Sequence, residues 1–275
     1  MKKSIGIFVA FALIITIAAN SAIGQQKGKS GKPFSYRSLA NNAFDYGERL
    51  DYDVTYSFIK AGTGYFHILP KPQYRGANKE RECFDIRFQV NSLKSLEWIY
   101  KVKDTYRTVM DKQGLFPWEF EQHTREGGYS KDFKAYFDQI NHNAYVDEKK
   151  IRIDPYMHDV VSAFYYVRSL NLGSMKKGHI VNLKNFFDEE QYNLGVKIIG
   201  KQEVEVPAGK FKCVIIEPLV TEGGLFKSEG QIYIWVTDDE NKIPVKVSTK
   251  ILIGYVSAEL TKYSGLKNPA DAKID

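Results

Sequence analysis

Residues 50–58 read LDYDVTYSF, and their alternation decides the fold class. Every second position is aromatic or aliphatic: Leu50, Tyr52, Val54, Tyr56 and Phe58. Successive side chains of a strand point to opposite faces of a sheet, so this period of two predicts a strand with one buried face. Residues 84–90 repeat the pattern with phenylalanine, isoleucine and valine. We therefore expect an all-β fold.

The second half of the chain carries further strand signals. In residues 232–236, apolar side chains occupy both faces, because Ile232 and Ile234 alternate with Tyr233 and Trp235. Turn-forming residues separate such runs at hairpin spacing, among them Gly127-Gly128, Pro207-Ala208-Gly209 and Asp238 to Asn241. The pattern predicts a mainly antiparallel sheet that is barrel-like or strongly curved.

One segment, 155–170, follows a helical period instead. Asp154 and Pro155 suit the N-cap and the first helical position. Apolar side chains then recur every three or four residues, at Met157, Val160, Val161 and Phe164, followed by Arg168 or Leu170. We predict one α-helix of about four turns whose apolar stripe packs against the sheet.

The N-terminal residues have the pattern of a secretory signal. Lys2 and Lys3 precede an apolar run over 5–19, and small residues lead up to Gly24. We expect a signal peptide over 1–24, cleavage near Gly24, and a periplasmic or secreted protein that does not span the membrane afterwards. No cysteine lies near the cleavage point to carry a lipid anchor.

The rest of the chain divides by composition. The expected parts are a flexible leader at 25–43, a single β-rich domain at 44–264 and a polar tail at 265–275. A weak internal repeat relates the spacing from Cys83 to Asp111 to that from Cys213 to Asp238. It allows two pseudo-repeat halves, about 44–150 and 174–264, on either side of the helix.

Charge and cysteine content limit the partners. The formal net charge of +6 falls to +4 without Lys2 and Lys3, and basic and acidic residues are interleaved. This charge pattern favours solubility and only weakly suggests acidic partners such as lipid headgroups or anionic glycans, and export argues against nucleic acid as a partner. A disulfide between Cys83 and Cys213 is chemically allowed in an oxidising compartment, although strand parity places the two on faces of different polarity.

Three segments resemble a known family of exported bacterial proteins. They are KAGTG at 60–64, DVVSAFYYVRSL at 159–170, and IWVTDD at 234–239 with Pro244-Val245. Together they resemble domain of unknown function 3108, over roughly residues 47–263. The resemblance implies an all-β, barrel-like fold and an exported protein, and it brings no established catalytic residues.

Five residues are candidates for ligand binding. Gly62 and Gly64 share one strand face, where missing side chains would let a ligand or helix approach, although the pattern favours a bulge or a tight hairpin. Arg168 is expected to turn inward, as half of a buried ion pair or as an anion-binding group. Tyr233 and Trp235 would face a cleft if the other side of their strand faces the core.

Catalytic and metal-binding groupings are weak. Ser162 has His158 and Asp159 nearby on the helix, but a mid-helix serine usually bonds its own backbone. Glu119, Glu121 and His123 share one strand face, which is also the pattern of an exposed polar face. We predict no catalytic residue, no metal site and no cofactor.

Three functions remain open. The first is a non-catalytic binding or carrier protein for an apolar or envelope-derived ligand, such as a lipid or glycan. The second is an envelope glycan hydrolase that uses two carboxyl groups from Asp104, Asp132, Asp138 or Glu121. The third is a structural or assembly subunit whose edge strands pair with another envelope protein. An outer-membrane barrel is not favoured, because the chain ends in a polar segment at 267–275.

Overall fold

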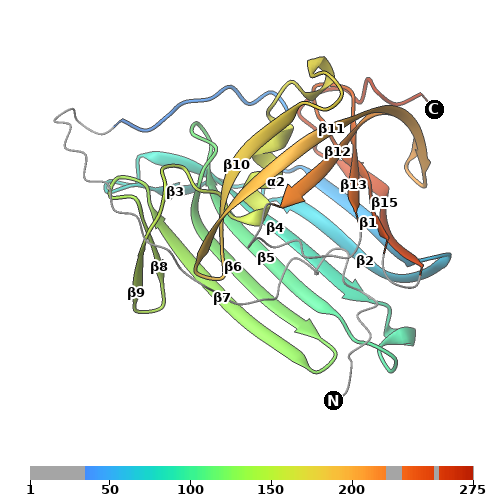
Figure 1. Cartoon of the computed structure of the whole chain (residues 1–275), viewed down its shortest axis with the longest axis horizontal. Coiled ribbons are helices and arrows are strands. Elements are labelled where there is room, and N and C mark those ends of the chain that lie inside the picture. Colours follow the sequence, from blue (N-terminus) through green and yellow to red (C-terminus); the bar gives the residue numbers. More distant parts are fainter. Residues whose placement is uncertain (1–34, 221–230, 251–253, 275) are drawn as a thin grey trace.

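The alternating apolar positions form one antiparallel sheet that bends back on itself (Figure 1). The structure, a computed structural model, describes residues 35–220, 231–250 and 254–274. Within these ranges the sheet has 15 strands, accompanied by one α-helix and two short 3-10 helices. This confirms the predicted fold class. The predicted signal peptide, 1–24, lies outside the described residues.

The elements follow one another along the chain mostly as hairpins. In order they are β1 (Arg49–Tyr56), β2 (Ile59–Ile68), β3 (Gln73–Arg75), β4 (Arg81–Ser92), η1 (Lys94–Leu96), β5 (Lys103–Asp111), β6 (Pro117–Glu126), β7 (Tyr129–Asp138), β8 (Asn143–Val146), β9 (Lys149–Arg152), α2 (Val160–Arg168), η2 (Leu172–Ser174), β10 (Ile180–Phe187), β11 (Glu190–Val206), β12 (Gly209–Val220), β13 (Ile232–Thr237), β14 (Pro244–Lys250) and β15 (Tyr255–Ser264).

The strand order joins the first and last strands in the middle of the sheet. It runs β10-β11-β12-β13-β14-β15-β1-β2-β4-β5-β6-β7-β8-β9, with β3 paired to β4 at the side. We call β1 to β9 the N-terminal arm and β10 to β15 the C-terminal arm. In Figure 1 the C-terminal arm crosses over the N-terminal arm, and α2 lies between them. The two arms therefore enclose an inner face.

The helix begins later than the sequence predicts. Its N-cap is Asp159, whose carboxylate accepts hydrogen bonds from Val161 N and Ser162 N, while the hydroxyl of Ser162 bonds back to Asp159 N. This capping box satisfies the free N–H groups of the first turn. Tyr156 has a positive φ of 55°, which is incompatible with a helix starting at Asp154. The helix is thus capped by Asp159, and not by Asp154 as the Asp-Pro pair suggests.

Both sides of α2 are buried, each against a different part of the core. Val161 and Tyr165 belong to the larger apolar cluster, which is built mainly on the N-terminal arm. Ala163 and Val167 belong to a smaller cluster with the C-terminal arm. The helix is short, so this two-sided packing rather than propensity stabilises it.

The predicted strand at 50–58 ends two residues early. Ser57 has a positive φ of 53° and closes the turn between β1 and β2, and the pairing of Tyr56 with Ile59 completes the hairpin. Phe58 therefore sits at a hairpin tip, where 91% of its surface is exposed, instead of continuing the buried face.

The segments flanking the domain are attached to it. Arg37, in the predicted leader, donates hydrogen bonds to the carbonyls of Gly114 and Leu115. In the predicted tail, Ala272 is buried and Ile274 N donates to Lys210 O. The described parts of both segments thus lie against the sheet.

Both cysteines are free and buried. The disulfide that the sequence allows is therefore not formed, and burial raises the pKa of both thiols, that of Cys213 to about 12. In register, Cys83 faces Asp111 on the next strand and Cys213 faces Thr237. The internal repeat stays a prediction: Cys83 pairs with Asp111, as the repeat spacing has it, whereas Cys213 pairs with the residue before Asp238.

Candidate functional site

An apolar cavity of about 140 Å³ lies between the two arms and the helix. The N-terminal arm supplies aromatic rings, α2 supplies aliphatic and aromatic side chains, and the C-terminal arm supplies mostly aliphatic ones. The lining residues are Tyr52, Phe66, Phe88, Tyr106, Val160, Val161, Ala163, Phe164, Val167, Asn185, Phe187, Leu194, Val196, Ile216, Pro218, Ile232, Ile234, Pro244 and Val247.

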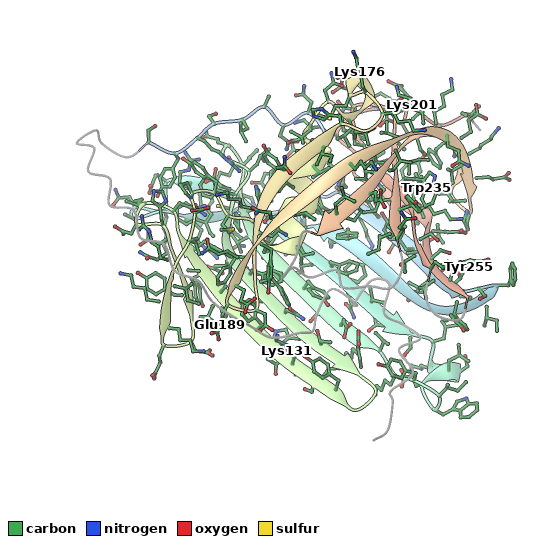
Figure 2. The ribbon with its side chains drawn as sticks, in the orientation of Figure 1. Lys131, Lys176, Glu189, Lys201, Trp235 and Tyr255 are labelled. Atoms are coloured by element: carbon green, nitrogen blue, oxygen red, sulfur yellow. The ribbon has the colours of Figure 1, made fainter. Side chains whose placement is uncertain are left out.

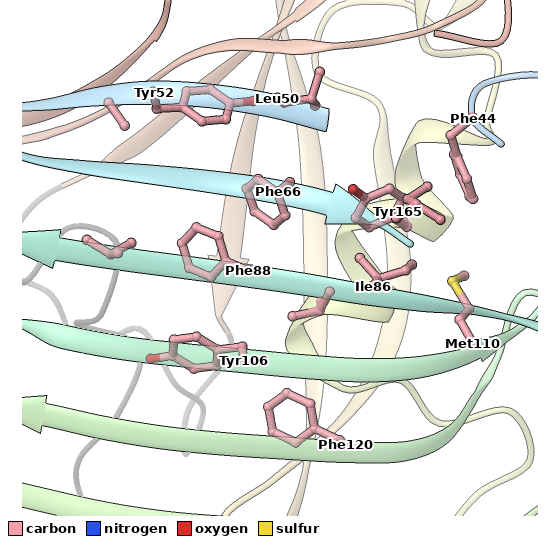
Figure 3. Close-up of a cluster of buried hydrophobic side chains, with 14 of the residues drawn as sticks. Phe44, Leu50, Tyr52, Phe66, Ile86, Phe88, Tyr106, Met110, Phe120 and Tyr165 are labelled. Atoms are coloured by element: carbon pink, nitrogen blue, oxygen red, sulfur yellow. The ribbon is translucent and has the colours of Figure 1, made fainter. Parts of the chain in front are cut away.

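The aromatic wall of the cavity follows directly from strand register. Phe66 faces Phe88 across β2 and β4, and Phe88 faces Tyr106 across β4 and β5. The ring centroids are 4.3 Å apart in the first pair and 5.5 Å apart in the second. Phe164 of α2 stacks on Phe66 at 5.2 Å. Figure 3 shows Phe66, Phe88 and Tyr106 in a row across adjacent strands, and Tyr52 lies beside this row on β1.

An apolar space of this size is costly when it is empty. The lining is only partly closed, since Phe164, Ile232 and Ile234 are half-buried, so apolar surface is left exposed to water unless something covers it. An engineered apolar cavity of about 150 Å³ stays dry and accepts benzene. The cavity therefore suits one aromatic ring or a short stretch of an acyl chain.

One lining residue, Asn185, carries an amide. Asn185 on β10 is 2% exposed, and its Oδ1 atom receives no hydrogen bond from the described residues. A buried acceptor without a donor is destabilising by about 1 to 3 kcal/mol. A ligand that brings a hydroxyl or amine hydrogen to this atom would remove that penalty.

A second group of buried polar side chains adjoins the aromatic wall. Gln122 on β6 is directly opposite Tyr106, and Asp104 and Glu126 lie further along the same inner face. Gln122 Nε2 donates to Thr124 Oγ1 at 2.7 Å. Gln122 Oε1 lacks a donor among the residues that the structure describes, and Asp104 Oδ2 and Glu126 Oε1 lack one when both carboxyl groups are ionised. We call Asp104, Gln122, Thr124 and Glu126 the polar cluster.

The two carboxyl groups of the polar cluster both have raised pKa values. Burial, followed by the charge of Asp104, raises the pKa of Glu126 to about 8. Burial also raises the pKa of Asp104, although the N–H of Arg125 donates to its Oδ1 at 2.8 Å and partly opposes this. The carboxyl groups hydrogen-bond to each other, which requires one of them to be protonated.

The structure does not assemble the carboxylates proposed for glycan hydrolysis. Asp104 faces inward, whereas Asp132, Asp138 and Glu121 alternate with the inner-face residues of β6 and β7 and face outward. The inward neighbour of Asp104 is Glu126, but glycosidase carboxyl pairs lie about 5 to 10 Å apart and so do not hydrogen-bond to each other. The hydrolase alternative therefore gains no support here.

Gly62 and Gly64 serve strand pairing and do not line the cavity. A Cβ atom on Gly62 would lie 2.5 Å from the carbonyl oxygen of Asn91, and one on Gly64 would lie 2.9 Å from that of Gln89. The register shift opposite Val54 marks a β-bulge at this point. The glycines are explained by close approach of β4.

Arg168 is fully enclosed at the end of α2. It forms two bonds of 2.7 Å with the carboxylate of Glu48, and it donates to the carbonyls of Lys242 and Asn241. Burial lowers the pKa of Arg168, but the carboxylate of Glu48 more than offsets this and raises it overall. Each nitrogen of the guanidinium has a protein partner, so the structural role accounts for this residue.

Tyr233 and Trp235 face away from the cavity. Ile232 and Ile234, at the alternate positions of β13, line it instead. On the outer face, Trp235 Nε1 donates to Gln202 Oε1 at 3.1 Å, and its ring lies 6.2 Å from that of Tyr233. Figure 2 labels Trp235 on this strand. Ligand binding by this outer pair stays a prediction.

The helix serine is part of the capping box. Its hydroxyl contacts Asp159 and lies 3.3 Å from His158 Nδ1. Burial, assisted by the charge of Arg37, lowers the pKa of His158 to about 3. All these groups are enclosed away from the cavity lining, where a substrate would have to bind. Within the described ranges, no group of side chains could hold a metal ion.

Sequence reasoning missed the polar residues of the inner face. Gln122, Thr124 and Glu126 share strand parity with buried Phe120, which is a signal that polar groups are buried there. Asn185 carried no such signal, because its position depends on how the C-terminal arm folds over the other.

Comparison with known families agrees with this geometry. Residues 51–261 match the profile described as "Protein of unknown function (DUF3108)". The chain belongs to this family. The match covers both arms and the helix, so the DUF3108 region contains the whole cavity. No curated protein matches the chain.

Three solved structures are similar in fold. A β-barrel-like protein of domain of unknown function DUF1849 from Brucella abortus is 13% identical, with a TM-score of 0.47, over 80% of this chain and 98% of that one. A protein from Parabacteroides distasonis, provisionally described as a lipoprotein, is 9% identical with a TM-score of 0.36, covering 84% and 100%. A protein from Bacteroides fragilis, provisionally described as exported and YmcC-like in fold, is 11% identical with a TM-score of 0.31, covering 84% and 100%.

In the part of the chain that the structure describes, no helix has the length and apolar character needed to cross a membrane.

Proposed function

We propose that this DUF3108 protein is a non-catalytic carrier of the bacterial envelope that holds an amphipathic ligand in the cavity between its arms. The apolar cavity of about 140 Å³, lined from both arms and α2, is the observation that carries the proposal. The signal pattern of residues 1–24 supports an envelope location.

The ligand is proposed to have an apolar part and at least one hydrogen-bond donor. The apolar part would fill the space beside Phe66, Phe88 and Phe164. The donor would meet Asn185 Oδ1 or, past Tyr106, Gln122 Oε1, which are two of the buried acceptors without donors. Asp104 and Glu126 lie further along the same face, so a neutral or cationic head fits that end of the inner face better than an anion.

The assembly alternative has less support. One of the two edge strands, β9, spans only four residues, and Lys149, Lys150 and Arg152 are exposed on it, whereas the other edge strand, β10, spans eight residues. Short, lysine-rich edges oppose pairing with another strand.

A matched pair of variants tests the proposal. Ile234→Trp places a large ring in the cavity, whereas Tyr233→Trp introduces the same residue at the adjacent, outward position of β13. We expect 1-decanol to raise the thermal midpoint of the wild type and of Tyr233→Trp, but not of Ile234→Trp.

Native mass spectrometry of the same proteins reports what they carry after purification. A lipid-sized adduct on the wild type that is absent from Ile234→Trp supports the carrier function. Equal responses of both variants to decanol, together with equal adducts, would show that the cavity is not the binding site.

A further inference from the structure

Four hairpin connections meet at one rim of the sheet. Antiparallel register places the turns β1–β2, β4–β5, β6–β7 and β14–β15 at the same ends of their strands, because the paired strands run from this rim and return to it. In Figure 1 the first three turns lie along the lower right margin. We call the described residues 57–60, 93–103, 127–129 and 250 with 254–255 the hairpin rim.

The hairpin rim carries the most exposed apolar side chains in the described structure. Phe58 is 91% exposed, Trp98 is 83% exposed, and Ile59 and Ile99 are 62% and 58% exposed. They project from the tips of two separate hairpins, and Phe58 is held edge-on against Tyr255 at 5.9 Å. Large exposed apolar groups concentrated in one region mark an interaction surface.

Unpaired basic side chains accompany these tips. Lys94, Lys103 and Lys250 are exposed and form no ion pair with any described residue. The other two lysines of the rim are paired, Lys60 with Asp53 and Lys101 with Glu97. The rim therefore presents apolar tips within a net positive field.

We propose that the hairpin rim docks on the surface of an anionic phospholipid bilayer. Tryptophan and other aromatic residues favour the headgroup region, where an apolar ring and a polar edge can both be satisfied. Lysines beside them are attracted to anionic headgroups. A flat protein interface would favour a continuous apolar patch with few lysines, whereas separate tips can each insert between lipids.

This inference is independent of the cavity's content, because it concerns a surface and not the enclosed space. The polar cluster nevertheless lies on the same side. Asp104 is the second residue of β5 and Glu126 is the last residue of β6, so both lie next to the hairpin rim. A carrier docked by this rim would present that end of its inner face to the bilayer.

Vesicle sedimentation tests the docking. We expect the purified protein to bind vesicles of 30% phosphatidylglycerol in phosphatidylcholine. Replacing both Phe58 and Trp98 by serine should lower the affinity for these vesicles by about tenfold. Replacing Lys94 and Lys103 by glutamine should weaken binding by about fivefold for each lysine. The same replacement should have little effect on the weak binding to pure phosphatidylcholine.

The opposite rim supplies a matched control. Ile140 is 49% exposed in the turn after β7, at the other end of the strands, and Ile140→Ser should bind vesicles as the wild type does. Insertion should also shift Trp98 fluorescence to shorter wavelength, and Trp98→Phe should bind but lose the shift. The proposal is overturned if the wild type does not bind anionic vesicles, or if the rim variants and Ile140→Ser bind equally.

Discussion

Two buried ionic groups lie at opposite ends of the same inner face, and their surroundings differ. The Arg168–Glu48 pair, next to the start of β1, has a protein partner for each guanidinium nitrogen and both carboxylate oxygens. The polar cluster, next to the hairpin rim, has two carboxyl groups and no cation among its members, and Gln122 Oε1 has no donor.

The difference separates a buried group whose hydrogen bonds the protein completes from one whose hydrogen bonds it leaves incomplete. Burying ions is costly, and the cost is offset only when charge and hydrogen bonds are complete. The Arg168–Glu48 pair meets that condition and fixes the end of α2 against the sheet. The polar cluster does not meet it, so the protein retains a local instability beside its cavity. Such unsatisfied groups are expected where a ligand completes the bonding.

The largest effect on stability is expected at the Arg168–Glu48 pair. Arg168→Met leaves the Glu48 carboxylate buried without a cation, which should lower the free energy of unfolding by about 3 to 5 kcal/mol. Urea denaturation followed by circular dichroism measures this. The double variant Glu48→Leu with Arg168→Met should recover most of the loss, because an apolar pair has no charge to satisfy. Equal stability of the single and double variants would contradict the structural role of the pair.

This end of the molecule is also the one that the sequence predicts best. The helical spacing predicts that Arg168 points inward, and a buried arginine requires a carboxylate, so an ion pair is the expected outcome. Its partner could not be predicted, because Glu48 is 120 residues away in sequence and comes close only when β1 pairs with β15. The start of the helix was wrong for a similar reason: Asp154 and Asp159 both suit an N-cap, and packing decided for Asp159.

The cavity end was harder to predict. Alternation identified the strands and their apolar faces, including Ile232 and Ile234, but not which side of each strand faces the enclosed space. That depends on the bend that brings β13 over β4 and β5, which no local pattern encodes. Tyr233 and Trp235 were selected for their aromatic chemistry, and the structure places them outside the cavity.

The pH dependence of stability sharpens the comparison. The folded protein holds the Glu126 proton up to about pH 8, whereas the unfolded chain releases it near pH 4.5. Between these values the folded state binds more protons, so stability is fully present below pH 4.5 and is lost as the pH rises towards 8. The expected loss is about 2 kcal/mol, after a discount for solvent screening of a partly exposed group.

Glu126→Gln should remove this slope, the decrease of the free energy of unfolding with rising pH, when urea denaturation is measured at intervals from pH 5 to 8.5. Glu121 offers a control on the outer face of the same strand. Although burial alone would raise the pKa of Glu121, its bond to Lys134 lowers it overall, so its contribution changes only at acid pH. Glu121→Gln should therefore keep the wild-type slope. If Glu126→Gln keeps it too, the polar cluster does not hold the proton.

The smallest effect is expected at the cavity itself, and its sign is the informative part. Asn185→Leu removes a buried acceptor that has no donor, so the ligand-free protein should become more stable by about 1 kcal/mol. Asn241 is equally buried, but its amide donates to the carbonyls of Asn268 and Pro269. Asn241→Leu should therefore destabilise the protein, by about 1 to 3 kcal/mol in the same urea titration. Opposite signs for two buried asparagines would show that the cavity is built for an absent hydrogen-bond donor, whereas destabilisation by both would mean that Asn185 already has its partner within the chain.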